Sequence, residues 1–228
     1  MTADLIDDLV TDFNPFSTIK LVDVKKIFVC NTLHIREGSI ITINGDNYTV
    51  ISANPKTGEI NLKEDTDDIE IGDFMYGTAP FFFHGTPQAT GNDLIKYAQS
   101  ETQFPVPMIY LFEVLSDKMN YNEEDAIDRE SVVDLFFLDE ANFRDWDTDQ
   151  HYSEAINPMS NYADLFVKYL KQAQGIGVIL DAEMTYHAKF GLSTKLESGH
   201  LKNLFPENLS GTRLRIKIPF LKSLTCDC

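Results

Sequence analysis

The stretch FFLDEANFRDWDTDQHY, residues 136–152, holds the residue types that most readily do chemistry in this chain. It begins as an apolar run and continues with closely spaced carboxylates and a histidine. These side chains are Asp139, Glu140, Asp145, Asp147, Asp149 and His151. Carboxylates at alternate positions beside an imidazole are typical of a divalent-metal site. The stretch therefore has two interpretations, a metal-dependent active site and a solvated acidic loop.

The spacing of Asp145, Asp147 and Asp149 matches the first three ligands of a calcium-binding loop. That loop also requires glycine at its sixth position and a bidentate glutamate at its twelfth. Here those positions hold Gln150 and Ile156, and an isoleucine side chain cannot ligate a cation. We therefore predict a solvated acidic loop that follows a buried strand and holds no metal ion.

Other catalytic patterns are also missing from the sequence. It has no Walker-type phosphate loop, no dinucleotide fingerprint and no Gly-x-Ser-x-Gly elbow. The histidines lack ligand spacing, and Cys30, Cys226 and Cys228 give neither a disulfide framework nor a zinc pattern. We expect no catalytic residue, no cofactor and no metal. The alternative is a metal-dependent hydrolase or nuclease that uses the acidic stretch Asp139–Asp149.

The composition limits the classes of partner. The chain has 228 residues, of which 43% are hydrophobic, and a formal net charge of −17. Such a charge disfavours a free-standing nucleic-acid binder and docking on an anionic membrane. No apolar run is long enough to span a bilayer, and the N-terminal MTADLIDDLVTDF is acidic where a signal peptide is basic. We expect synthesis in a reducing cytoplasm and no membrane contact.

Patterns of hydrophobicity predict three segments. Residues 1–17 are predicted to hold an amphipathic N-terminal helix and the residues that terminate it, because apolar residues recur at helical spacing. Residues 18–78 read as a small β-rich, barrel-like subdomain. Asn44-Gly45 is a strong hairpin signal there, and Pro55–Gly58 supplies a second turn. Residues 79–228 remain as an α+β core domain.

The core domain carries strand and helix signals. Pro107–Leu115 and Val132–Leu138 are near-continuous apolar runs typical of central strands, with an acidic, exposed segment, Ser116–Glu130, between them. Asn157-Pro158 is expected to open a long helix that ends before Gly175. The predicted fold class is α+β: a mixed or antiparallel sheet with packed helices, plus a small β-barrel-like insertion.

The last predicted strand, Thr212–Phe220, has two chemically different faces. Leu214, Ile216 and Ile218 alternate with basic residues, so we expect the apolar set to face the core. We expect the basic row to meet an acidic patch of a neighbouring chain, such as Glu123–Asp125. The residues proposed for a subunit interface are Phe81, Phe82, Phe83, Trp146, Arg213, Arg215 and Lys217.

A resemblance to a known class of proteins is carried by four segments. They are FFFHGTPQATGNDL, FPVPMIYLFEVL, DLFFLDEANFRDWDTDQHYSEAINPMSNYADLFVKYL and LSGTRLRIKIPFLKSLTCDC. Together they resemble virion structural proteins of tailed bacteriophages, in particular neck and tail-ring subunits, including ring proteins of crAss-like phages and tail-terminator-like proteins. The similarity covers about two-thirds of the chain, from Ala79 to Cys228. It lies in the general character of these segments and in the order of the expected elements, and not in a catalytic signature.

This resemblance implies a viral structural protein that forms a homo-oligomeric ring in the virion neck or tail, of head-to-tail connector or tail-terminator type. The expected partners are other virion proteins, namely the portal and neighbouring ring or tail proteins. DNA would pass through the ring's lumen without specific binding. A solitary protein-binding adaptor, docking through Phe81–Phe83, is the remaining alternative.

Overall fold

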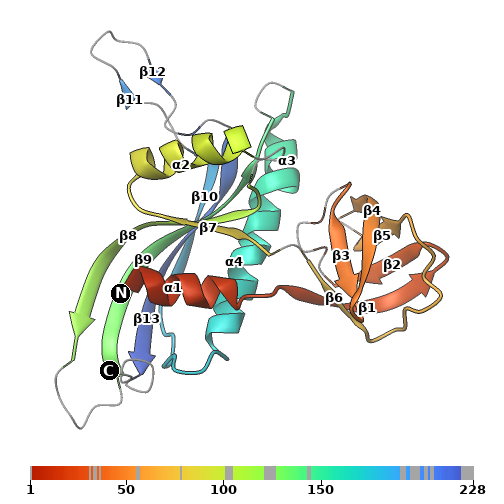
Figure 1. Cartoon of the computed structure of the whole chain (residues 1–228), viewed down its shortest axis with the longest axis horizontal. Helices are drawn as coiled ribbons and strands as arrows, with labels where there is room; N and C mark the ends of the chain where they lie inside the picture. The colour runs from red at the N-terminus through yellow and green to blue at the C-terminus, as the bar shows by residue number, and fades with distance from the viewer. Residues whose placement is uncertain are drawn as a thin grey trace. The chain divides into compact units, whose positions relative to one another are not determined.

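The computed structural model describes the chain in segments that together hold most of its residues. They are residues 2–30, 32, 35, 37–54, 57–77, 79–100, 105–120, 127–142, 145–190, 194–195, 201–202, 205 and 208–221. The chain forms two compact units, Phe13–Ala79 in one and Met1–Asp12 with Pro80–Cys228 in the other. The fold is α+β and contains a small closed barrel, as the sequence predicted (Figure 1).

The smaller unit is a closed antiparallel barrel with the strand order β1-β2-β5-β4-β3-β6. Its strands are β1 (Phe16–Asp23), β2 (Lys26–Val29), β3 (Ile40–Ile43), β4 (Asp46–Asn54), β5 (Glu59–Leu62) and β6 (Phe74–Tyr76). Buried and exposed residues alternate along most of these strands, so one side of each strand fills the barrel interior.

The β3–β4 hairpin confirms the turn that the sequence predicted. Ile43 pairs with Asp46, and the two residues between them have φ angles of +54° at Asn44 and +93° at Gly45. Two successive positive φ values match the twist of a two-residue antiparallel connection. Asparagine and glycine are the residues that adopt this conformation at least cost.

The larger unit is built on a five-stranded sheet with the order β10-β13-β9-β8-β7. Its strands are β7 (Phe81–His84), β8 (Met108–Met119), β9 (Ile127–Glu140), β10 (Ala182–Phe190) and β13 (Leu209–Leu221). A separate two-stranded sheet joins β11 (Thr194–Lys195) to β12 (Leu201–Lys202). In the five-stranded sheet β7 runs parallel to β8, and every other neighbouring pair is antiparallel.

The two apolar runs do form central strands, but both strands are longer than predicted. Asp117 pairs with Ser131 and Lys118 with Glu130, so both ends of the segment Ser116–Glu130 belong to the ladder. Polar side chains on these ends form hydrogen bonds with one another. A hydropathy pattern does not reveal such pairs. Ser131 Oγ donates to Asp117 Oδ1 at 2.8 Å.

Helix α1 (Thr2–Thr11) is fastened to the same pair of strands. Thr2 Oγ1 donates to Asp117 Oδ2 at 2.8 Å, and Arg129 Nη1 donates to Thr2 Oγ1 at 3.1 Å. Ile6 and Val10 are the buried apolar residues of this helix. The N-terminal helix therefore belongs to the sheet unit and is not an independent segment of residues 1–17.

Helix α4 begins at Asn157 as predicted, but other helical turns precede it, so Asn157-Pro158 does not open the helical stretch. The helical stretch runs through α3 (Thr148–His151), the π-helical turn Tyr152–Ile156 and α4 (Asn157–Leu170). Asn157 has helical φ and ψ angles, and its backbone N–H donates to the carbonyl of Tyr152. This wider hydrogen bond directly precedes Pro158, which lacks an N–H to continue the ordinary pattern. None of the described helices is long and apolar enough to cross a bilayer.

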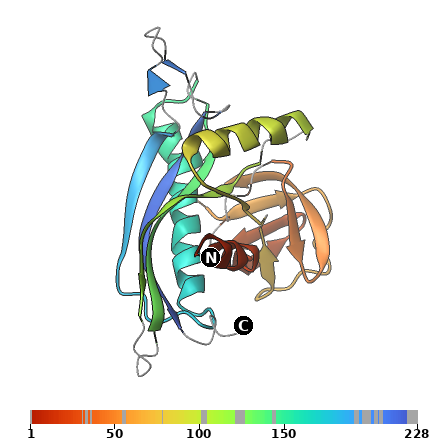
Figure 2. The ribbon, with the colours of Figure 1, turned by 60° about the vertical axis from the view of Figure 1, so that its left-hand side comes forward.

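The sheet has two differently covered faces (Figure 2). On one face Leu214, Ile216 and Ile218 are buried as predicted, and Phe137 packs against Phe166 of α4 with ring centroids 5.7 Å apart. On the other face α2 (Pro87–Ser100) lies over an aromatic core cluster. That cluster consists of Leu94, Met108, Tyr110, Phe136, Leu138, Phe205 and Leu209.

We predict that Gly211→Ala destabilises the sheet unit by about 1–3 kcal/mol, the usual cost of overpacking. A Cβ atom at this position would lie 1.9 Å from the carbonyl oxygen of Phe137, inside the β9–β13 ladder. Gly177→Ala is the matched control, since its Cβ would meet side-chain atoms and no backbone atom: the ring of Pro219 at 3.1 Å and Leu221 Cδ2 at 3.5 Å. Chemical denaturation measures the free energy of unfolding of both variants. Equal values would show that Gly211 does not approach the carbonyl of Phe137 this closely.

Candidate functional site

The acidic stretch begins a helix. Asp147 is the N-cap of α3: its carboxylate accepts the backbone N–H of Gln150, and the Gln150 side chain accepts the backbone N–H of Asp147, both at 2.9 Å. This reciprocal pair is a capping box. Asp145 and Asp149 are exposed beside it. The carboxylates of Asp145, Asp147 and Asp149 are therefore solvated, as predicted, but that of Asp147 also caps a helix.

The two carboxylates at the end of β9 differ in their surroundings. Asp139 is fully buried, and its Oδ1 accepts the backbone N–H of Glu140 at 2.7 Å, whereas Glu140 is exposed. Among the described residues, no group of three or more His, Cys, Asp or Glu side chains is placed to hold a metal ion. The described part of the chain thus offers no observation that favours the hydrolase alternative.

Trp146 folds back over its own chain. Its indole meets His151 edge-on with ring centroids 5.5 Å apart, and its backbone N–H donates to the carbonyl of Asn142 at 3.1 Å. The side chain is half-buried. These contacts fix the turn before the capped helix, and the use of Trp146 as an interface anchor stays a prediction.

The three phenylalanines of β7 do not share one environment. Phe81 and Phe83 pack against the aromatic core cluster, and Phe81 also meets Tyr97 of α2 edge-on at 5.6 Å. Phe82 points to the opposite face, because neighbouring residues of a strand alternate. Its ring lies 6.0 Å from that of His84. Phe81 and Phe83 thus contribute to the fold, and Phe82 is the more plausible contact residue.

The basic row of β13 has its partners within the chain. Arg213 pairs with Asp134 through Nη2 and Oδ2, and Arg215 Nε lies 3.3 Å from Oδ1 of the same carboxylate. Lys217 Nζ lies 2.9 Å from Glu130 Oε2. Asp134 is almost fully buried, with 5% of its side chain exposed. The acidic segment that we expected to meet this row, Glu123–Asp125, lies outside the described residues.

A histidine borders this charged patch. His187 of β10 lies opposite Gly211, and its ring is 5.6 Å from that of Phe136. Burial, and then the positive charge of Arg213, lower the pKa of His187 below its usual value. The charged patch and the aromatic core are therefore continuous on one face of the sheet.

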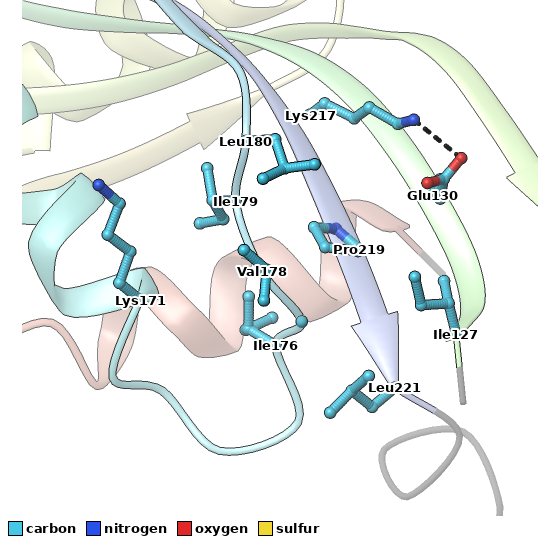
Figure 3. Close-up of a pocket in the computed structure, with 11 residues that line it drawn as sticks. Ile127, Glu130, Lys171, Ile176, Val178, Ile179, Leu180, Lys217, Pro219 and Leu221 are labelled. Atoms are coloured by element: carbon cyan, nitrogen blue, oxygen red, sulfur yellow. Dashed lines mark ion pairs between the residues drawn. The ribbon is translucent and has the colours of Figure 1, made fainter. Parts of the chain in front are cut away.

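The best candidate for a binding surface lies at the C-terminal end of β13, where the segment 176–180 runs beside the strand (Figure 3). Gly177 N donates to Pro219 O at 2.7 Å, and Leu221 N donates to Gly175 O at 2.8 Å. A pocket of about 720 Å³ opens there, which we call the edge groove. Its lining residues are Ile127, Glu130, Lys171, Ile176, Gly177, Val178, Ile179, Leu180, Lys217, Pro219 and Leu221.

The edge groove is apolar at its centre and charged at its rim. Val178 and Leu180 are 77% and 89% exposed, so two apolar side chains at alternate positions of one segment stand in solvent. The Lys217–Glu130 pair stands at one side and Lys171 at the other (Figure 3). An apolar centre with a charged rim is the usual anatomy of a protein–protein contact. The sequence alone does not mark this segment, because a short apolar run such as residues 176–180 is equally compatible with a buried strand.

Comparison with known proteins gives no further guide to this surface. No protein-family model matches the chain, and no curated protein matches it.

We predict that Asp147→Ala lowers the free energy of unfolding by about 1 kcal/mol, the typical contribution of an N-cap. Asp147→Asn should be nearly neutral, because asparagine caps helices as well as aspartate does. Asp149→Ala is the control, since Asp149 makes no cap. Thermal and chemical denaturation of the three variants test the assignment, and an equal loss in Asp147→Ala and Asp149→Ala would contradict it.

The pairs around Asp134 make the double variant Arg213→Glu with Arg215→Glu a test of the fold. It would leave a buried carboxylate beside two more, and breaking a buried ion pair costs about 3–5 kcal/mol. We therefore predict a destabilised monomer. Lys217→Glu is the matched control on the same strand, because its pair with Glu130 is more exposed and contributes under about 1 kcal/mol. If the double variant has the same free energy of unfolding as the unmodified chain, the ion pairs of Asp134 do not stabilise the fold.

Proposed function

We propose that this protein is a ring-forming structural subunit of a tailed-bacteriophage neck or tail, of head-to-tail connector or tail-terminator type. The observation that carries the proposal is the edge groove, an exposed apolar surface at the end of the sheet. The resemblance of residues 79–228 to virion structural proteins agrees with it. A structural subunit of this kind requires contacts and no catalytic constellation.

The charge of the chain suits a ring around DNA. Each copy carries a formal net charge of −17, so a lumen built from these copies repels phosphates. DNA could then pass without being held. The cations of β13 do not weaken this argument, because each of the three is paired with a carboxylate of β9.

The groove also bears on the adaptor alternative. That alternative uses Phe81–Phe83 as the docking residues, but Phe81 and Phe83 are packed against the aromatic core cluster. A segment with Val178 and Leu180 in solvent offers more apolar surface to a partner. Self-assembly through the groove is therefore the better use of the surfaces that are present.

The proposal predicts that Leu180→Asp weakens self-association by about tenfold or more, since burying a leucine contributes about 1.5–3 kcal/mol. Val24→Asp is the matched control: Val24 lies in the barrel unit and is 78% exposed. Sedimentation and native mass spectrometry measure the association of both variants and of the unmodified chain. Equal losses in the two variants would contradict a role for the groove.

A particle-level measurement tests the function itself. Mass spectrometry of purified virions should find the protein in a fixed number of copies per particle. A chain that is monomeric at every concentration and absent from virions would refute the ring.

A further inference from the structure

We propose that neighbouring copies join through the two edges of the sheet, with β10 of one copy pairing with β7 of the next in antiparallel fashion. The inference rests on the proposed ring and specifies its contact: the partner is a second copy of this chain. Among the described strands, β10 has a neighbour only in β13, and β7 has one only in β8. Open edges of this kind are templates for pairing with another chain.

The outward side of β10 offers a run of backbone groups. Lys217 N donates to Asp181 O at 3.3 Å, which fixes the alternation of the β10–β13 ladder. Residues at odd positions therefore bond to β13, and Ala182, Met184 and Tyr186 direct their N–H and C=O groups away from it. Tyr186 is 54% exposed, so the strand is open at this point.

The outward side of β7 is shorter and partly used. Phe81 N donates to Pro107 O at 3.0 Å and Gly85 N to Leu111 O at 3.2 Å, so Phe82 and His84 direct their backbone groups outward. The His84 carbonyl accepts the hydroxyl of Thr90 at 3.4 Å. Within the described part of the chain, both backbone groups of Phe82 and the N–H of His84 face away from β8 and can pair with a partner strand.

The strand directions fit a closed ring. β7 runs with β8, β8 runs against β9, β9 against β13, and β13 against β10, so β7 and β10 point in opposite directions. Rotation about an axis along the strands preserves every direction, and β10 then meets the next β7 antiparallel. The two edges are different surfaces, so the contact is heterologous and can close into a ring. Pairing of β10 with β10 would stop at a dimer.

The charges beside the two edges are complementary. Helix α1, which packs near β7, exposes Asp4, Asp7 and Asp8 and contains no basic residue. Lys171, at the end of α4, lines the edge groove close to the start of β10. Both helices cover the same face, since α1 is fastened near Ser131 and α4 packs on Phe137, two residues of equal parity on β9. Edge pairing would bring the acidic helix of one copy toward the cation of the next.

Site-directed cross-linking tests the contact. In a chain whose three cysteines are replaced by serine, His84→Cys with Tyr186→Cys places one exposed thiol at each edge, and both thiols lie on the same face. A short bis-maleimide applied to the assembled protein should give a ladder of covalent oligomers. His84→Cys with Thr185→Cys is the matched control, because Thr185 is also exposed but faces the other side; its ladder should be several-fold weaker. Phe82→Cys replaces His84→Cys if that variant fails to fold.

The other outcomes separate the two proposals. A dimer from Tyr186→Cys alone would show β10–β10 pairing and overturn the inference. Oligomers of normal mass that give no ladder would also overturn it, while the ring itself would stand. Monomers at every concentration, together with absence from virions, would refute the ring and the edge pairing alike.

Discussion

The ladder between β9 and β13 is the constraint on which the sheet unit depends. It pairs residues from Leu209↔Glu140 to Leu221↔Ile127, and it sends alternate side chains to opposite faces from Leu209 to Phe220. One set meets α4 and forms a core. The other set meets α2 at one end and forms ion pairs at the other. A shift of one residue would exchange the two sets and bury the cations, so the register is strongly specified.

That register also explains why the basic row has its ion-pair partners within the chain. Arg215 lies opposite Asp134 across the ladder, and Arg213 reaches the same carboxylate from the next position on its face. A carboxylate this well buried is costly without such partners, so both arginines are committed to the fold. The proposed assembly would then use surfaces outside this charged row, namely the open strand edges and the edge groove.

The sequence predicted the features that local patterns determine. The Asn44-Gly45 hairpin, the central apolar strands and the two faces of β13 follow from turn chemistry and from the period of two. It did not predict features that depend on contacts between distant residues. Asp117, Arg129 and Thr2 lie far apart in the chain, and their network extended the strands and fixed the first helix. Asp147 and Gln150 have the Asp-x-x-Gln spacing of a capping box, a signal that the predicted helix start at Asn157 did not take into account.

The charge of the chain sets the kind of contact that can hold copies together. Subunits of net charge −17 repel one another, and salt damps this repulsion beyond about 8 Å under physiological conditions. Attraction must therefore come from groups in direct contact, such as apolar side chains and strand-edge backbone groups, which salt screens little. Long-range repulsion would keep free copies apart, and short-range pairing would hold them once a template brings them close. An acidic chain with an apolar edge groove has both properties.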